Sequence, residues 1–554
     1  MKHRDGTTAS QDMATAGGIT RRKLLVQSLM GGAAAAMGLG GMGGAAWAQA
    51  TSGEPTRGEP TRGGNLAWMV TAEPASYDPL VGLQSFVINV LAPCYNNLVR
   101  YDPFAPTEVI GDLAESWEVS EDGTTYTFKL KSGVVWHDGQ PFTAADVKHT
   151  FDTLRAPPEG VISIRQNLLA AVSSIDVVDD LTVQFVLSRP QRAFLQIMAI
   201  GWMIVLPKHV MEAKGSMADD IVGTGPFRFV SHDVGVSIQL ERNPDYHVEG
   251  LPYLDGMTIY VIPDRNAGFN YLRAGQLHLL DGITTEDGRR AEAEFGDVVD
   301  VQTVQSYTFA SLTLNTKREP WNDPRVRQAV SLAIDRREAL QVLRQGDGVI
   351  GGLMPPGQWS LSEEALAAVP GYGTDIEASR AEARRLLADA GFADGLTTTI
   401  TTRTGATFEA AAIFIQDQLR RVGIDATLQP QETATFEDNL ARRNFDLSPY
   451  SRTIYVNDAD AVFPDFYACG AQMNLSSLCN EQLDALLEQQ GQAQDDTERL
   501  RLVNEMDAMG LTDAGEIVLY WRDRCLAHSV KMHDFSLHPE PENNRRMAEV
   551  WLSA

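Results

Sequence analysis

The segment 113–147 constrains the fold of this chain most, because it combines a strand pair with a capped helix. Two runs of alternating apolar and polar residues, 116–119 and 126–130, flank the dipeptide Asp122-Gly123. Period-two alternation on both sides of Asp-Gly is the strongest short-range signal for a β-hairpin. Thr143 then opens an amphipathic stretch, and this predicts an N-capped helix directly after the hairpin.

Strands and helices alternate along the rest of the chain. Apolar residues at helical spacing in 325–340 indicate one helix, and Gly423 is placed to cap the end of another. Alternation of the two element types predicts α/β lobes with largely parallel sheets. The other predicted strands are 63–70, a strand pair at 176–187, 236–242, 256–262, 398–402 and 426–430, and the other predicted helices are 86–98, 378–389 and 408–422.

Size and charge bound the class of protein. The 554 residues suggest about three to four domains, and 44% hydrophobic with 21% charged residues is ordinary for a soluble globular chain. The formal net charge is −27; without residues 1–50, which hold five basic and two acidic residues, 41 basic and 71 acidic residues remain, a net charge of −30. Such a charge repels nucleic acid and anionic lipid surfaces, so no nucleic-acid partner is expected.

The N-terminus resembles an export signal. Residues 20–25, which contain Arg21-Arg22, are similar to a twin-arginine signal, and the weakly apolar run 24–47 leads into small alternating residues that fit a signal-peptidase site. Cleavage after Ala48 and cleavage after Ala50 both remain open, as does an uncleaved membrane anchor. We expect residues 1–50 to be removed, 51–62 to form a polar flexible tether, and the mature protein to reside in the periplasm.

Export gives the four cysteines a meaning, because disulfides persist in oxidising compartments. Cys469 and Cys479 enclose a short loop just before an amphipathic stretch, and this makes them a good candidate for a disulfide. Cys94 and Cys525 have no sequence reason to pair, and free buried thiols or a second bridge are both open.

No recognisable set of catalytic residues is present. The chain has no HExxH, no pair of CxxC motifs, no phosphate-binding P-loop and no GxSxG elbow. We therefore expect no catalytic residue, no cofactor and no metal site. His528, His533 and His538 recur at a spacing that does not share one helical face, and they are expected at the surface.

An ordered set of motifs resembles the family 5 extracellular solute-binding proteins, which are the peptide, nickel and opine receptors of ABC importers. The cysteine loop is also similar to one in the peptide-binding members. The resemblance extends over nearly the whole chain after the export signal, and its motifs are 113–147, 222–229, 240–246, 314–316, 323–335, 353–357 and the loop around Cys469 and Cys479.

The resemblance implies an α/β fold of the two-lobe periplasmic-binding-protein type, with an extra inserted domain. Two hinge strands, placed here at 309–315 and 517–522, would join the lobes, and the ligand cleft would lie between them. The implied boundaries are 63–98, 225–308 and 516–554 for lobe I, 99–224 for the inserted domain, and 309–515 for lobe II.

The resemblance also implies the function. The chain would be a monomeric periplasmic receptor that closes over a small solute and delivers it to a pair of permease subunits with cytoplasmic ATPases. Candidate solutes are a modified peptide such as glutathione, an opine-like conjugate, another carboxylate-bearing compound or a metal chelate. A receptor feeding a sensor kinase or chemoreceptor is the alternative, and a secreted hydrolase is disfavoured because no nucleophile with its base is recognisable.

The family's specificity region corresponds to 445–460. Asp458-Ala459-Asp460 keeps its acidic motif, but Tyr455 stands where peptide-binding members have the Asp that pairs with the peptide amine. Arg452 is expected to anchor a ligand carboxylate, since a guanidinium binds carboxylates bidentately. Arg403 ends a predicted strand, a usual ligand position in α/β folds, and the residues implied at the pocket edges are Tyr307, Trp359 and Glu73.

Overall fold

The computed structural model describes residues 59–554 except 75, 81–84, 158–162, 164 and 494. The predicted export signal, its cleavage site and residues 51–58 of the predicted tether lie outside the described residues. The described residues belong to one compact unit, Ala50–Ala554. Within the described part of the chain, no helix combines the length and the hydropathy needed to cross a membrane.

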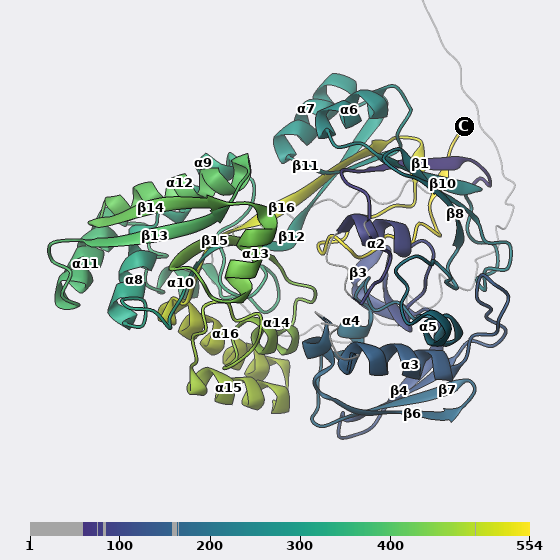
Figure 1. Cartoon of the computed structure of the whole chain (residues 1–554), viewed down its shortest axis with the longest axis horizontal. Coiled ribbons are helices and arrows are strands. Elements are labelled where there is room, and N and C mark those ends of the chain that lie inside the picture. The colour runs from purple at the N-terminus through teal and green to yellow at the C-terminus, as the bar shows by residue number, and fades with distance from the viewer. Residues whose placement is uncertain (1–58, 75, 81–84, 158–162, 164, 494) are drawn as a thin grey trace, which may run out of the picture. The chain divides into compact units, whose positions relative to one another are not determined.

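One mixed sheet of ten strands forms the centre of the described structure (Figure 1). In spatial order its strands are β14 (Ile424–Gln431), β13 (Leu396–Arg403), β15 (Leu447–Thr453), β12 (Val299–Leu314), β16 (Glu516–Ser529), β11 (Leu279–Ile283), β1 (Asn65–Val70), β10 (Gly256–Val261), β9 (Ser237–Arg242) and β8 (Phe227–Asp233). β1 is parallel to β10 and β11, and β13 is parallel to β14 and β15. The other pairs are antiparallel, so the prediction of largely parallel sheets was wrong; hairpins and the two long central strands supply the antiparallel pairs.

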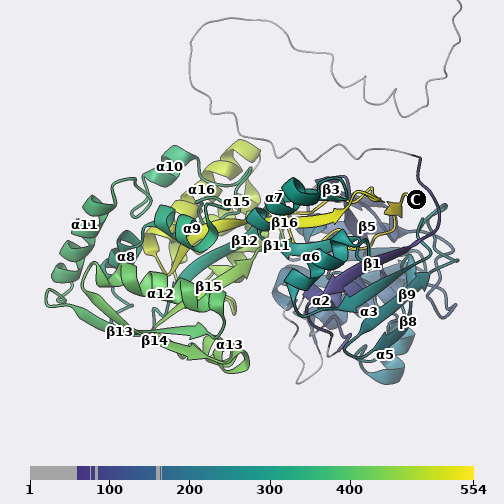
Figure 2. The same cartoon turned by 90° about the horizontal axis from the view of Figure 1, so that it is seen from above.

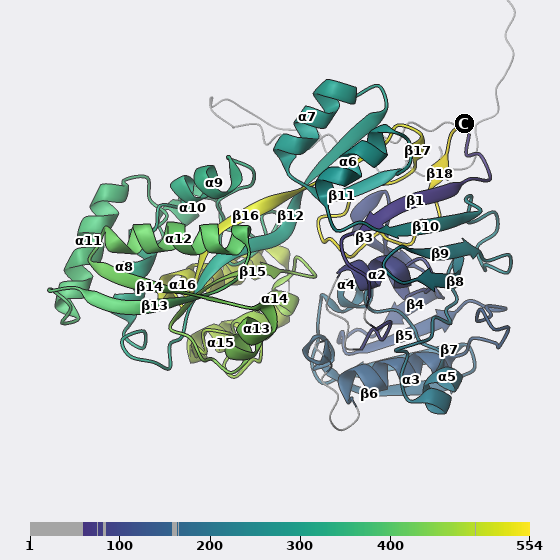
Figure 3. The same ribbon diagram turned by 45° about the horizontal axis from the view of Figure 1, so that its top comes forward.

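The long strands β12 and β16 connect the two groups of strands (Figure 3). β15 pairs with β12 only over Thr308–Leu314, and β11 pairs with β16 only from Cys525 to His528. The register of β12 against β16 shifts between Gln305 and Phe309. Each long strand thus takes part in both groups of strands. Of the segments predicted to join the lobes, 517–522 lies within β16, and 309–315 runs one residue past the end of β12 at Leu314.

The segment 99–224 contains the predicted hairpin and helix. Its four-stranded antiparallel sheet has the order β4-β5-β7-β6, with β4 Ala114–Val119, β5 Thr125–Leu130, β6 Val172–Asp179 and β7 Thr182–Leu187. Gly123 has a φ of 68°, and Asp122 Oδ1 accepts hydrogen bonds from the Thr124 N–H and hydroxyl at 3.1 and 2.8 Å. Helix α3 (Ala144–Arg155) follows, and Asp146 Oδ2 accepts from the Thr143 N–H at 2.9 Å. The hairpin and the N-capped helix are confirmed.

Helices cover the sheets, and α12 packs against β13 and β14 (Figure 2). The remaining helices are α2 (Ser85–Leu91), η1 (Gln166–Leu169), α4 (Phe194–Met198), α5 (Lys208–Lys214), α6 (Arg265–Arg273), α7 (Thr285–Phe295), α8 (Pro324–Ala333), α9 (Arg336–Arg344), α10 (Glu363–Ala367), α11 (Ile376–Asp389), α12 (Ala406–Arg420), α13 (Thr433–Ala441), α14 (Ala459–Phe466), α15 (Glu481–Gln492) and α16 (Asp496–Asp513). The remaining strands are β2 (Val99–Asp102), β3 (Ala105–Gly111), β17 (Met532–His533) and β18 (Trp551–Leu552).

Two helix predictions were wrong in extent. The single helix predicted for 325–340 is broken at Ile334, which is extended, because the Asp335 carboxylate caps a new helix by accepting from the Arg337 and Glu338 N–H groups. The helix predicted to run to residue 98 ends at Leu91, since Pro93 has no N–H to continue the ladder.

Two of the three C-terminal histidines are buried, contrary to the surface prediction. His528 and His538 are 5% and 4% exposed. His538 Nδ1 accepts from the Glu540 N–H at 3.0 Å, and its Nε2 lies 3.0 Å from the Pro106 carbonyl oxygen. Burial lowers the pKa of His538 to about 4, so it packs as a neutral ring.

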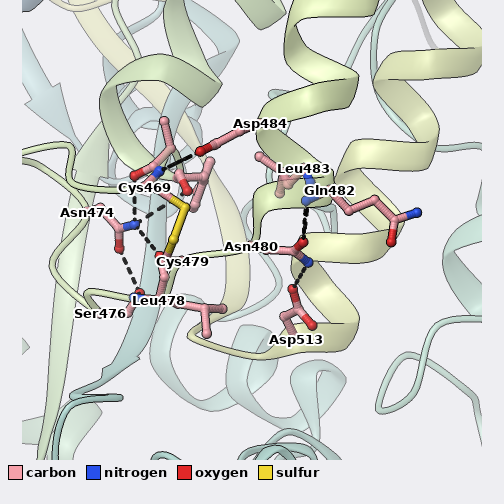
Figure 4. The surroundings of a disulfide bond; sticks show 12 residues. Cys469, Asn474, Ser476, Leu478, Cys479, Asn480, Gln482, Leu483, Asp484 and Asp513 are labelled. Carbon is pink, nitrogen blue, oxygen red and sulfur yellow. Dashed lines mark hydrogen bonds between the residues drawn. A yellow bond between two sulfur atoms is a disulfide. The ribbon is translucent and has the colours of Figure 1, made fainter.

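The predicted disulfide between Cys469 and Cys479 is present (Figure 4). The Asn474 side chain also closes this loop, because its Nδ2 donates to the carbonyl oxygens of Ala468 and Leu478 at 3.1 and 2.7 Å. Cys94 and Cys525 are free and buried, so the question that the sequence left open is resolved in favour of buried thiols.

Replacing both Cys469 and Cys479 with serine should lower the free energy of unfolding by about 3 kcal/mol, because the unfolded chain loses its loop constraint. Denaturant unfolding with and without a reducing agent measures this. The reducing agent should destabilise the wild-type protein and leave the double variant unchanged. Equal stability of the two proteins under oxidising conditions would contradict the prediction.

Candidate functional site

The acidic motif 458–460 lies at the N-terminus of α14, and a buried arginine, Arg499, forms an ion pair with it. Asp458 caps the helix by accepting from the Asp460 N–H at 2.9 Å. Arg499 donates to both oxygens of Asp458, at 2.8 and 2.6 Å, and stacks over the Trp359 ring at 4.6 Å. The structure therefore brings two predicted site residues together, Asp458 and Trp359, with Arg499 between them.

A second contact reaches the same motif from the segment 99–224. The Arg192 backbone N–H donates to Asp460 Oδ2 at 2.9 Å. The Arg192 guanidinium donates to Asp496 Oδ1 at 2.9 Å and to the Ala493 carbonyl at 2.6 Å. Three hydrogen bonds from one residue thus connect the segment before α4 with α14 and with the turn between α15 and α16.

Tyr307 and Tyr455 lie where the long strands change partners. The Ile454 N–H donates to the Tyr307 carbonyl at 2.8 Å, so the loop after β15 is held to β12 beside Tyr455. Burial raises the pKa of both phenols, and the nearby Glu542 carboxylate adds to the rise at Tyr455. Both tyrosines are half-buried, and aromatic side chains are common in the walls of ligand sites.

The C-terminal segment supplies buried carboxylates to this junction. Glu540 is fully buried, and Trp202 donates its indole N–H to Glu542. Burial raises the pKa of Glu540 well above its usual range, and the neighbouring Glu542 raises it further. Arg165 stacks over Trp202 at 4.0 Å, and its charge acts in the opposite direction on Glu542. The junction therefore holds charge of both signs in a dry environment.

Arg452 is buried and already paired. Its Nε donates to Glu516 Oε1 at 2.8 Å, and its Nη1 donates to the Met473 carbonyl at 2.8 Å. The guanidinium also lies 5.1 Å from the Phe466 ring centre. Glu516 on β16 thus pairs with the Arg452 guanidinium, which the sequence suggested as the anchor for a ligand carboxylate.

The two other predicted residues lie elsewhere, each with contacts of its own. Arg403, at the end of β13, stacks on Phe408 at 3.9 Å. Glu73 accepts from the Gly235 N–H at 2.7 Å and lies 3.2 Å from His232 Nε2, at the hairpin between β8 and β9. The contacts of these residues do not join them to Asp458 or Tyr455.

Six residues of these two places were not predicted from the sequence: Arg165, Trp202, Glu540 and Glu542 in the junction, and Arg192 and Arg499 at the acidic motif. Only the C-terminal pair carried a signal: Glu540-Pro541-Glu542, followed closely by Arg545-Arg546, is a dense group of opposite charges. Arg192 and Arg499 sit in ordinary surface-like sequence, and only their tertiary partners distinguish them.

Comparison with known proteins places these features in context. The family model described as "Bacterial extracellular solute-binding proteins, family 5 Middle" matches residues 108–474. A glutathione-binding protein of Pectobacterium atrosepticum is 27% identical over 476 residues, covering 84% of this chain and 90% of the relative. A probable D,D-dipeptide-binding periplasmic protein of Escherichia coli is 26% identical over 488 residues, with the same two coverages.

Solved structures share the fold. A periplasmic binding protein of A. tumefaciens R10 in complex with agropinic acid has a TM-score of 0.77 at 24% identity, covering 89% of this chain and 99% of that one. A periplasmic protein of Helicobacter pylori in complex with the peptide STSA gives the same four values. The oligopeptide-binding protein of Bacillus subtilis with a nonapeptide has a TM-score of 0.74, covering 90% and 100%. The predicted two-lobe fold is confirmed.

Proposed function

Because this chain belongs to family 5 of the bacterial extracellular solute-binding proteins, we propose that it is the periplasmic receptor of an ABC importer. Its two lobes close over a small organic solute and present it to a pair of permease subunits driven by cytoplasmic ATPases. The proposed lobes keep the boundaries set out above, with the change of strand partner in β12 and β16 as the hinge. The protein acts as a monomer after removal of the segment that ends near Ala50.

The observation that carries this proposal is the junction built from both lobes. Tyr455 follows β15 in lobe II, whereas Glu542 belongs to the C-terminal part of lobe I and Arg165 to the inserted domain. The charges of Glu542 and Arg165 both act on the Tyr455 phenol. A site assembled from separate lobes changes its exposure when they move, and this is the property that a capturing receptor needs.

The solute is proposed to be small and to carry a carboxylate. The names of the relatives include glutathione, dipeptides and agropinic acid, and all of these compounds have carboxylates. Tyr307 and Tyr455 are the proposed walls of the site. Asp458 and Trp359 support it from behind through Arg499, and Arg452, Arg403 and Glu73 remain predicted contacts.

Ligand binding should be detectable as thermal stabilisation. At a hundredfold excess over Kd, a ligand stabilises the folded protein by about 2.7 kcal/mol. Glutathione, an L,L-dipeptide, a D,D-dipeptide and agropinic acid are each added to the purified protein, and one chemical class should raise the melting temperature. Native mass spectrometry of protein taken from its own periplasm then identifies a retained compound. The receptor proposal would be contradicted if no compound raised the melting temperature and no compound was retained.

A Tyr455→Phe variant tests the site within the same assay. The ring remains, so the fold should be unaffected, but the phenol hydroxyl, on whose pKa the charges of Glu542 and Arg165 act, is removed. We expect about tenfold weaker binding of the stabilising solute if that phenol donates to it. Tyr271→Phe, at a 43% exposed tyrosine on α6, is the matched control. Equal affinity of both variants would remove Tyr455 from the site.

A further inference from the structure

We propose that Arg192 is a clasp that holds the inserted domain to lobe II, and that Asp458-Ala459-Asp460 serves this closure rather than touching the solute. The contacts of Arg192 do not depend on the proposed receptor function. Only their consequence, a slower opening of the cleft between the lobes, rests on it. The contacts themselves lie within the described residues and involve no ligand.

The side chain of Arg192 binds the end of a helix. Ala493 is the C-cap residue of α15, and its carbonyl accepts from Arg192 Nη2 at 2.6 Å. Carbonyls at a helix C-terminus have no partner within the helix and carry partial negative charge, so a guanidinium is favoured there. Asp496, in the first turn of α16, completes the pair with Nη1 at 2.9 Å.

The receiving surface in lobe II carries excess negative charge. Asp458 and Asp460 are 6% and 2% exposed, and the buried cation beside them is Arg499. Arg499 lies 2.6 Å from Asp458 but 3.5 Å from Asp460, so Asp460 has the weaker ion pair. Gln490 donates to Asp460 Oδ1 at 2.5 Å, and the N–H of Arg192 donates to Oδ2. Closure therefore gives Asp460 Oδ2 a donor at 2.9 Å, the Arg192 N–H, whereas Arg499 of lobe II lies 3.5 Å from the same oxygen.

The donating side is held rigidly. The Tyr126 hydroxyl, on β5, donates to the Gln191 carbonyl at 3.2 Å, and the Phe194 N–H donates to the same oxygen at 3.1 Å. Arg192 thus lies between a strand contact and the first turn of α4. Because its backbone is fixed, little conformational entropy is lost when it meets α14.

A second contact reaches α14 from the same inserted domain. Helix α14 packs against η1, and the Asn167 side chain of η1 lies close enough to lower the pKa of Asp465 on α14. Burial raises the pKa of Asp465 to about 6, as expected for a carboxyl enclosed between two elements. Helix α14 is therefore the surface of lobe II on which the inserted domain rests, and Arg192 provides its charged contacts.

Electron paramagnetic resonance distance measurements on the solute-free protein test the clasp. Spin labels are placed at Glu212→Cys on α5 and Glu488→Cys on α15, two exposed positions on opposite sides of the contact. The free cysteines Cys94 and Cys525 are buried and shielded from the label. In Arg192→Ala, the population of molecules at the longer distance, relative to the population at the shorter distance, should rise about tenfold. The reason is that two side-chain hydrogen bonds to lobe II are lost.

The matched control is Arg189→Ala, three residues earlier in the same loop, which removes an equal charge without removing the bonds to Ala493 and Asp496. Its distance distribution should equal that of the wild-type protein. A charge exchange, Arg192→Asp with Asp496→Arg, should restore part of the shorter distance that Arg192→Asp alone loses. An unchanged distribution in Arg192→Ala, or one matched by Arg189→Ala, would overturn the proposal. These distances require no solute, so a failed solute screen leaves the clasp standing.

Discussion

Replacing Arg452 with methionine should lower the free energy of unfolding by about 3–5 kcal/mol, because the Glu516 carboxylate would remain buried without its cation. Glu516 is 5% exposed, and its Oε1 accepts from both Arg452 Nε and the Ser311 hydroxyl at 2.8 and 2.7 Å. Urea unfolding followed by tryptophan fluorescence measures the loss. Arg442→Met, which breaks an exposed ion pair with Asp438, should change stability by less than about 1 kcal/mol.

A second substitution separates the structural role of Arg452 from the predicted role as a ligand anchor. In Arg452→Met with Glu516→Gln, no charge is stranded, so most of the lost stability should return. If Arg452 also binds a solute carboxylate, the double variant regains stability but not affinity for the solute that stabilises the wild-type protein. If it is structural alone, both return. Wild-type stability in the single variant would contradict the expected cost.

Replacing Asp281 with asparagine should have a cost of the same order, about 3–5 kcal/mol. Its Oδ2 accepts from Arg524 at 2.6 Å and also from Arg545, and the two arginine side chains are 7% and 2% exposed. The paired guanidinium groups hold the pKa of Asp281 well below its usual range, against the effect of burial. Loss of the carboxylate leaves two buried cations facing each other.

Asp300→Asn is the control for Asp281→Asn, because this carboxylate lies on β12 and its side chain is 63% exposed. Denaturant unfolding of the two variants should differ by several kcal/mol. The Asp281 variant should also lose solute binding, because Arg545 Nε donates to the carbonyl oxygen of Pro541, the residue between Glu540 and Glu542, at 3.0 Å. Similar stability of both variants would show that Arg524 and Arg545 find other partners, and it would contradict the predicted contribution of Asp281 to stability.

Local sequence was sufficient for features that depend on neighbouring residues. The turn at Asp122-Gly123, the cap at Thr143 and the loop between Cys469 and Cys479 each involve residues within a few positions of one another. Helix limits failed where a local competitor was overlooked: Asp335 starts a new helix, and Pro93 prevents an old one from continuing. The mixed character of the sheet was also missed, because strand direction depends on where the chain returns.

The candidate site also contains residues that the sequence could identify and contacts that it could not. Tyr307, Tyr455, Asp458 and Trp359 were identified by family position; Tyr307 and Tyr455 belong to the junction, Asp458 and Trp359 share a contact with Arg499, and their roles at the solute stay predictions. Arg452 was identified by its chemistry, which is correct for binding a carboxylate, but the structure supplies that carboxylate from Glu516 on β16. A sequence shows that a residue can form a strong ion pair; it does not show with which partner.

By itself, the sequence determined the family, the local elements and the absence of a recognisable catalytic motif, since these depend on short motifs and on their order along the chain. Only the tertiary structure decided which distant groups meet: Arg524 with Asp281 and Glu542 with Trp202 in buried surroundings, and Arg192 with Asp496 nearer the surface. The physical reason is that a buried charge is stable only beside a partner, and these partners are more than 200 residues apart in the chain. No periodicity or spacing records such a distance.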